Sequence, residues 1–324
     1  MKTNRRNFIA KSILATAGVA SSLKSVGETN SKATFPSAPK VGTFSISIFS
    51  KNLHWLNYSE MASAAVEMGF DGIDLTVRPE GHVLPERVVD DLPKAVEAIK
   101  KAGLHVYMIT TAITDVESPF AESILKTAST LGVAYYRMGW IQYDFKISMD
   151  DNLKTFKKRL TVLAELNKKY NIQAHYQNHS GTSFGSPIWD LWMALKELDT
   201  PWIRSQYDVL HAMVEGANSW TLGLNLLQSY IGTLDIKDFQ WAKKDGKWVS
   251  EVVPLGQGMV DYKKYLSLIK QKNIEAPFSM HYEYPLGGAE NGARVLTMGK
   301  EEILSSMKRD LEFFRKLLTE AGLK

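Results

Sequence analysis

From Val41 onward, short runs rich in β-branched and aromatic residues alternate with longer stretches in which apolar residues recur every three or four positions. The short runs predict strands at Val41–Phe49, Gly72–Val77, His105–Thr110, Tyr135–Trp140, Gln173–Asn178, Ser205–Val209, Gly232–Ile236 and Phe278–Tyr282. The longer stretches predict helices at Tyr58–Met68, Pro85–Lys101, Ala121–Leu131, Leu153–Lys169, Pro187–Leu198, Thr221–Tyr230, Tyr262–Lys272 and Glu301–Ala321. Eight strands, each followed by a helix, are typical of an α/β fold that closes as a parallel (β/α)8 TIM barrel.

Glycine marks the end of several expected helices, as in Met68-Gly69, Ala102-Gly103 and Leu131-Gly132. An open, doubly wound sheet would show the same alternation of strand and helix, and it is the alternative fold. That fold places a glycine-rich phosphate turn after its first strand when it binds a dinucleotide, and no such turn follows Phe49. The closed barrel is therefore the better prediction.

The N-terminal segment differs in composition from the rest of the chain. Arg5-Arg6 precedes an apolar run rich in small residues, which resembles a twin-arginine export signal. Residues 24–39 then resemble a spacer, so residues 1–39 are assigned to a signal peptide and spacer, and residues 40–324 to a single barrel domain. Export would place the protein in the periplasm; a fortuitous basic N-terminus on a cytosolic protein is the alternative.

The formal charge of +4 belongs to this N-terminal segment. Residues 1–32 contain six Lys or Arg and one acidic residue, and the remainder holds 33 basic and 34 acidic residues. A body with this balance offers no electrostatic reason to bind nucleic acid. No run after residue 30 approaches the roughly 18 apolar residues of a membrane span, and the absence of cysteine excludes disulfides, thiolate metal sites and a nucleophilic Cys.

Polar residues are concentrated at the ends of the expected strands, which is where TIM barrels carry their active sites. Four of the seven histidines lie there. The candidates for contact with a substrate or ion are Arg78, His82, Arg137, Trp140, Tyr176, Gln177, His179, Asp208, His211, Asp235, Lys237, His281 and Glu283. Such a cluster is costly to bury without partners or a ligand. The alternative to a functional site is a set of salt bridges that closes the barrel mouth, for example between Lys237 and Asp208 or Glu283.

Five short motifs occur in a fixed order along the chain. They are GFDGIDL at 69–75, YQNH at 176–179, DVLHA at 208–212, IKD at 236–238 and LGQGMVD at 255–261. In this order and spacing, over roughly residues 40–320, the sequence resembles the xylose-isomerase-like sugar phosphate isomerase/epimerase family. The resemblance implies a TIM barrel that acts on a small-molecule sugar.

The resemblance also implies a divalent metal, held in that family by Glu, Asp, His and Glu on strands five to eight. The matching positions here are Gln177, Asp208, Asp235 and His281, and among them Asp208 alone keeps the family's residue type. Oxygen and imidazole ligands suit Mn, Zn or Mg. We expect a metal site at these residues, weakened by the loss of both glutamates.

The same replacement changes the expected mechanism. Family members use the two Glu as an acid–base pair, and the neutral amide of Gln177 cannot accept a proton. We expect His179 and Glu283 to act as acid–base groups, with Lys237 as the cation that polarises a carbonyl. Contacts to the sugar are expected from Arg78, His82, Arg137, Trp140, Tyr176 and His211.

The leading hypothesis is an exported enzyme of carbohydrate metabolism that enolises a sugar or keto-sugar next to its carbonyl. Isomerisation, epimerisation, elimination and hydration all begin with that step, and the altered Glu positions favour the lyase and hydratase variants. A catalytically inactive barrel that binds a glycan or a protein partner is the alternative, and a barrel endonuclease for abasic DNA is disfavoured by the charge. Trp220, Trp241 and Trp248 could form either a substrate lid or a contact between subunits of an oligomer.

Overall fold

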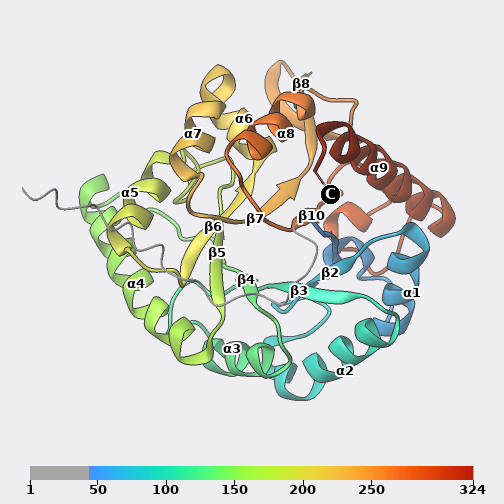
Figure 1. Ribbon diagram of the computed structural model, residues 1–324, viewed down its shortest axis with the longest axis horizontal. Coiled ribbons are helices and arrows are strands. Elements are labelled where there is room, and N and C mark those ends of the chain that lie inside the picture. The colour runs from blue at the N-terminus through green and yellow to red at the C-terminus, as the bar shows by residue number, and fades with distance from the viewer. Residues whose placement is uncertain (1–43, 324) are drawn as a thin grey trace, which may run out of the picture. The chain divides into compact units, whose positions relative to one another are not determined.

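The computed structural model describes residues 44–323. Eight parallel strands close into a barrel in the order β1-β10-β7-β6-β5-β4-β3-β2, which confirms the predicted TIM barrel. The strands are β1 (Ile46–Phe49), β2 (Gly72–Thr76), β3 (His105–Thr110), β4 (Tyr135–Arg137), β5 (Gln173–Gln177), β6 (Ile203–Asp208), β7 (Ile231–Ile236) and β10 (Phe278–Met280). They surround the centre of the molecule in Figure 1.

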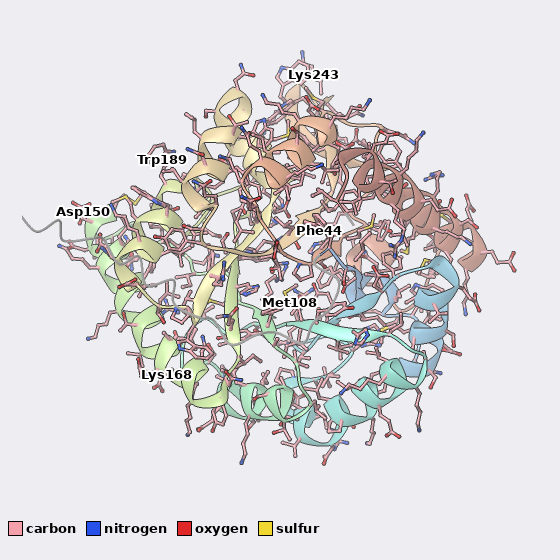
Figure 2. The ribbon with its side chains drawn as sticks, in the orientation of Figure 1. Phe44, Met108, Asp150, Lys168, Trp189 and Lys243 are labelled. Atoms are coloured by element: carbon pink, nitrogen blue, oxygen red, sulfur yellow. The ribbon has the colours of Figure 1, made fainter. Side chains whose placement is uncertain are left out.

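The helices form a ring outside the strands (Figure 1). They are α1 (Tyr58–Met68), α2 (Val88–Lys101), α3 (Ala121–Thr130), α4 (Met149–Tyr170), α5 (Trp189–Leu198), α6 (Val209–Gly216), α7 (Trp220–Leu227), α8 (Tyr262–Gln271) and α9 (Lys300–Ala321). Figure 2 shows Asp150 and Lys168 of α4 at the perimeter, whereas Met108 of β3 lies near the centre. None of the helices within residues 44–323 has both the length and the apolar character needed to cross a membrane.

Local sequence explains where these helices begin and which side they bury. Asn57 and Glu60 form a reciprocal capping box at the start of α1, and Gly69 ends that helix with a φ of 97°. In α2 the buried residues Leu92, Ala95, Val96 and Ile99 recur at helical spacing, so a single face packs on the barrel.

The strands end earlier than the sequence predicts at several positions. β4 ends at Arg137, and β10 ends at Met280, so Trp140, His281 and Glu283 lie in the loops that follow. β6 does not continue past Asp208, because its carboxylate accepts the backbone N–H of His211 and starts α6. Those loops, together with the carboxyl ends of the strands, carry the site.

An antiparallel hairpin follows β7, in a stretch where neither a strand nor a helix was predicted. It consists of β8 (Asp238–Lys244) and β9 (Lys247–Val253). Asp245-Gly246 joins the strands with positive φ at both positions, as a tight hairpin turn requires. Trp241 and Trp248 are exposed on this hairpin, whereas Trp220 at the start of α7 is only 5% exposed and packs near Tyr265. Trp220 is therefore a core residue, and a role in a lid or subunit contact is wrong for it.

The carboxylate of Asp238 fixes the hairpin to the barrel. It accepts the backbone N–H groups of Phe239, Gly256, Gly258 and Val260 at 2.9–3.1 Å. Asp238 is buried, so these four donors replace the water that would otherwise solvate its charge. The segment after Lys237 is thereby held at the barrel mouth.

The predicted twin-arginine signal and spacer, residues 1–39, lie outside the described residues, as does the predicted start of the first strand at Val41.

Replacing Asp238 with alanine should lower the free energy of unfolding by about 3 kcal/mol, because four buried backbone N–H groups lose a charged acceptor. Urea denaturation followed by circular dichroism measures this change. Asp150→Ala, at an exposed position on α4, is the matched control and should change stability by about 0.5 kcal/mol or less. An equal effect of the two substitutions would show that the carboxylate of Asp238 does not anchor the segment.

Candidate active site

A buried hydrogen-bonded chain crosses the barrel mouth from β4 to β7. Arg137 Nη1 donates to Gln177 Oε1 at 2.8 Å. Gln177 Nε2 then donates to Asp208 Oδ2 at 2.9 Å and to Asp235 Oδ2 at 2.6 Å. Arg137 needs an acceptor and the carboxylates need donors, so this network fixes the orientation of the Gln177 amide. One neutral amide thus separates two buried carboxylates.

The two carboxylates differ in charge. Burial and the neighbouring Asp208 carboxylate raise the pKa of Asp235 well above its ordinary value. Burial also raises the pKa of Asp208, but the net direction is downward, because the Lys237 ammonium pairs with its carboxylate at 2.9 Å. Asp208 therefore carries the negative charge of the pair, and Asp235, which also accepts from Gln206, is the member that takes a proton.

Lys237 is a buried cation with a partner for each of its three ammonium hydrogens. Its Nζ lies 2.9 Å from Asp208 Oδ2, 2.8 Å from His211 Nε2 and 3.3 Å from Glu283 Oε2. Burial lowers the pKa of Lys237, but the surrounding carboxylates raise it by more than burial lowers it, so the side chain stays protonated. Both ion pairs expected as the alternative to a functional site, Lys237 with Asp208 and Lys237 with Glu283, are therefore present.

The hydrogen bonds of His211 and His179 fix their tautomers. His211 Nε2 accepts from the Lys237 ammonium, so its Nδ1 carries the proton and donates to Ser180 Oγ at 2.9 Å. His179 Nδ1 donates to the backbone carbonyl of Ser180 at 2.9 Å, which leaves Nε2 of His179 with a free lone pair. The two rings pack with centroids 3.8 Å apart, and the Trp140 ring also packs against His179, with centroids 4.6 Å apart.

Glu283 lies at the partly exposed rim between two lysines. Its Oε1 is 3.3 Å from Lys51 Nζ, and its Oε2 is 3.3 Å from Lys237 Nζ. Burial raises the pKa of Glu283, but Lys237 and Lys51 lower it more strongly, so the net direction is downward. The carboxylate is therefore ionised and still 26% accessible in its side chain.

His281 occupies the inner end of the site as a neutral ring. It stacks on Phe49 with centroids 4.3 Å apart, and its Nε2 lies 3.5 Å from Asp235 Oδ1. Burial lowers the pKa of His281 well below its ordinary value. Neither ring nitrogen has a hydrogen-bond partner among the described residues.

The structure brings most of the predicted site residues together at one end of the barrel. The connected network described above consists of Arg137, Gln177, Asp208, His211, Asp235, Lys237 and Glu283. Four more predicted residues contact members of this network or Phe49: Arg78, Trp140, His179 and His281. β5 ends at Gln177, and His179, two residues later, lies in the loop and packs with His211 and Trp140.

Two predicted sugar contacts lie elsewhere. Tyr176 is fully buried, donates to the Phe184 carbonyl and accepts from the Ile141 N–H, so its hydroxyl is used inside the wall. The structure thus gives Tyr176 a packing role in place of sugar contact. His82 bonds Ser50 and packs edge-on against His54 at 4.7 Å, apart from the network of Lys237.

Sequence reasoning missed Lys51 and Phe49. Lys51 follows β1 directly, and the strand-end rule that selected the other candidates would have selected it as well. Phe49 is an apolar residue at a strand end, and no feature of the sequence distinguishes it from a core residue.

The four predicted metal ligands do not fit a divalent cation as they are arranged. Gln177 directs its N–H donors, and not its oxygen, at Asp208 and Asp235, and the Lys237 ammonium takes a further position on Asp208. Within residues 44–323, no group of three His, Cys, Asp or Glu side chains is placed to hold a metal. N–H donors thus compensate the charge that a metal would compensate.

Gln177→Glu should convert this arrangement into one that needs a cation. The substitution removes the N–H donors to Asp208 and Asp235 and adds a third negative charge, so we expect the free energy of unfolding in chelator to fall by about 3 kcal/mol. Mn²⁺ should raise the Tm of this variant, because it binds the folded state. Thermal unfolding with EDTA or with Mn²⁺ measures both effects.

Gln142→Glu, at an exposed position, is the matched control and should show neither change. A rise in the Tm of the unsubstituted protein with Mn²⁺, as large as that of Gln177→Glu, would show that the existing residues already bind the ion.

The sequence profile of the xylose isomerase-like TIM barrel family matches residues 62–316. A search of curated proteins gives no match.

Solved structures of three different proteins are similar to this chain. The 3-keto-D-glucoside 4-epimerase of E. coli has a TM-score of 0.62 at 15% identity and covers 84% of this chain and 99% of its own. A probable 3-DHS dehydratase of Bacillus anthracis has a TM-score of 0.64 at 16% identity, with coverage of 83% and 99%. A xylose isomerase-like TIM barrel protein of Mycobacterium smegmatis in complex with magnesium has a TM-score of 0.60 at 17% identity, with coverage of 83% and 98%. At these identities the likeness shows the fold, and together with the profile match over most of its length it establishes that this chain belongs to the xylose isomerase-like TIM barrel family.

Proposed function

We propose that this protein is an enzyme that removes a proton from the carbon next to the carbonyl of a sugar or keto-sugar, with His179 as the base. One observation carries the proposal: the Ser180 carbonyl holds the Nδ1 proton of His179 and leaves Nε2 free. The ring is half-buried beside Trp140, a residue that is 37% exposed and whose indole offers an apolar face of the kind on which sugar rings stack.

The surroundings of His179 keep it in the form that can accept a proton. Burial and the nearby Lys237 ammonium lower the pKa of His179 below its ordinary value. The ring is therefore neutral at neutral pH, as a general base must be.

Positive charge at the mouth would stabilise the enolate that forms when the proton leaves. The Arg137 guanidinium is buried, and its Nε has no partner within residues 44–323. A fixed cation in a site of low dielectric stabilises a developing oxyanion strongly. Arg137 is thus the proposed group on the carbonyl oxygen.

Lys237 acts as a positioning residue in this scheme, not as the group that touches the carbonyl. Its three hydrogens hold Asp208, neutral His211 and Glu283. Because the predicted metal ligands do not fit a cation, the proposed chemistry relies on the chain's own charged groups, and the metal assistance expected from the family resemblance is not part of it.

Glu283 would decide the outcome of the reaction. Its accessible carboxylate could take a proton from solvent and pass it to the opposite face of the enolate, which gives epimerisation, or to a departing hydroxyl group, which gives elimination. Similar structures include both an epimerase and a probable dehydratase, which supports a shared first step. The Arg5-Arg6 motif supports export to the periplasm as part of the proposal.

Incubation of the purified protein in D₂O with a 3-keto-glucoside should cause loss of the NMR signal of the proton next to the ketone. His179→Gln should slow this exchange by about 10²-fold or more, which is the usual contribution of a general base. The logarithm of kcat/KM should rise with pH and level off above an inflection below 6.5, because His179 must be neutral and its pKa is lowered. EDTA should leave the rate unchanged.

His105→Gln is the matched control, since His105 is exposed at the start of β3, and its rate should equal that of the parent. Saturable binding of keto-sugars with no exchange in the parent would refute the proposal and identify a binding protein. An exchange rate that EDTA abolishes would refute the metal-free mechanism alone.

A further inference from the structure

Three cationic side chains converge on one aromatic ring at the barrel mouth. Lys51 Nζ lies 5.7 Å, Arg78 Cζ 5.5 Å and Arg137 Cζ 5.6 Å from the centroid of Phe49. The ring is 2% exposed and comes from the end of β1, while the cations come from the chain after β1, after β2 and at the end of β4. Like charges so placed repel one another, and the contact with a ring face offsets only part of that repulsion.

Two of the three cations have partners, and the third does not. Lys51 pairs with Glu283, and Arg137 donates to Gln177 and lies over Trp140 at 5.0 Å. Within residues 44–323, no hydrogen bond or ion pair engages the guanidinium of Arg78, although the side chain is half-buried. An arginine presents five N–H donors, so Arg78 has its full capacity available.

The electrostatics of the cluster agree with a shortage of negative charge. Burial, and next Arg137, lower the pKa of Arg78 to about 10. Burial also lowers the pKa of Lys51. Glu283 raises this pKa, whereas the charges of Lys237 and Arg78 lower it, and the net direction is downward. A negatively charged ligand would relieve this repulsion.

We infer that Arg78, assisted by Lys51, binds a carboxylate of the substrate, so that the preferred substrate is a sugar acid. The inference rests on the proposed function, because it assigns a substrate class to the same site. An arginine fork matches a carboxylate through two parallel hydrogen bonds. Glu283 already shares Lys51, which favours the single charge of a carboxylate over the nearly double charge of a phosphate.

Titration calorimetry with unreactive sugars tests the inference without turnover. Methyl α-D-glucuronide carries a carboxylate where methyl α-D-glucoside carries a hydroxymethyl group, so the pair isolates the charge. We expect the glucuronide to bind about 30-fold more tightly, which corresponds to a charge-assisted hydrogen-bond pair. Arg78→Gln should reduce this preference to about threefold or less, while the neutral glucoside keeps its affinity.

Arg87→Gln is the matched control, because Arg87 is exposed before α2 and its substitution should leave the 30-fold preference intact. Equal binding of glucuronide and glucoside by the parent would overturn the inference, and so would tighter binding of glucose 6-phosphate than of the glucuronide. A preference for the glucuronide together with no proton exchange on any keto-sugar or keto-sugar acid would refute the proposed function and leave the carboxylate site standing.

Discussion

The buried ammonium of Lys237 is the constraint on which the rest of the site depends. A buried charge is tolerated when every proton has a partner, and here Asp208, His211 and Glu283 supply the three acceptors. Asp208 is fixed in turn, since its backbone N–H donates to the Asn178 side chain and its carboxylate caps α6. The ammonium therefore joins β6, β7 and the loop after β10. It also keeps His211 neutral and holds Glu283 where solvent can reach it.

Much of the fold follows from sequence patterns, because the periods of the apolar residues separate strand from helix. His105–Thr110 and Tyr58–Met68 agree with the structure at both ends. The hairpin at Asp238–Val253 was missed because its exposed strands carry lysine and tryptophan without a buried apolar face. The Asp245-Gly246 pair was the available signal. Strand ends were overextended where a polar side chain captured a backbone group, as Asp208 does at the start of α6.

The site was predictable in its members but not in its roles. Lys237, Asp208 and Glu283 were predicted from their positions at strand ends, because the carboxyl ends of all strands in a parallel barrel meet at one mouth. Roles depend on which atom faces which, and sequence spacing does not contain that information. Tyr176 shows the limit: it neighbours Gln177 in sequence, yet successive strand residues face opposite sides, so its hydroxyl is used within the barrel wall. The tautomer of His179 likewise depends on one backbone carbonyl in a loop.

The amide of Gln177 and the ammonium of Lys237 together compensate the charge that a metal ion would otherwise compensate. Asp208 and Asp235 lie close enough to share the Nε2 of Gln177, so both could ionise only with a strong cation between them. A neutral amide with a protonated Asp235, and Lys237 on Asp208, satisfies the pair without an ion. A glutamate at position 177 would add a third carboxylate that these donors cannot compensate. Neither carboxylate of this pair is then left as a free base for a substrate, because Asp235 is protonated and Asp208 is bonded to Lys237 and Gln177. The proposed function therefore places proton transfer at Nε2 of His179 and the accessible carboxylate of Glu283. The guanidinium of Arg78, which has no partner within residues 44–323, lies at the same rim. In the proposed function, the replacement of a glutamate by Gln177 would thus relocate the chemistry as well as weaken the metal site implied by the family resemblance.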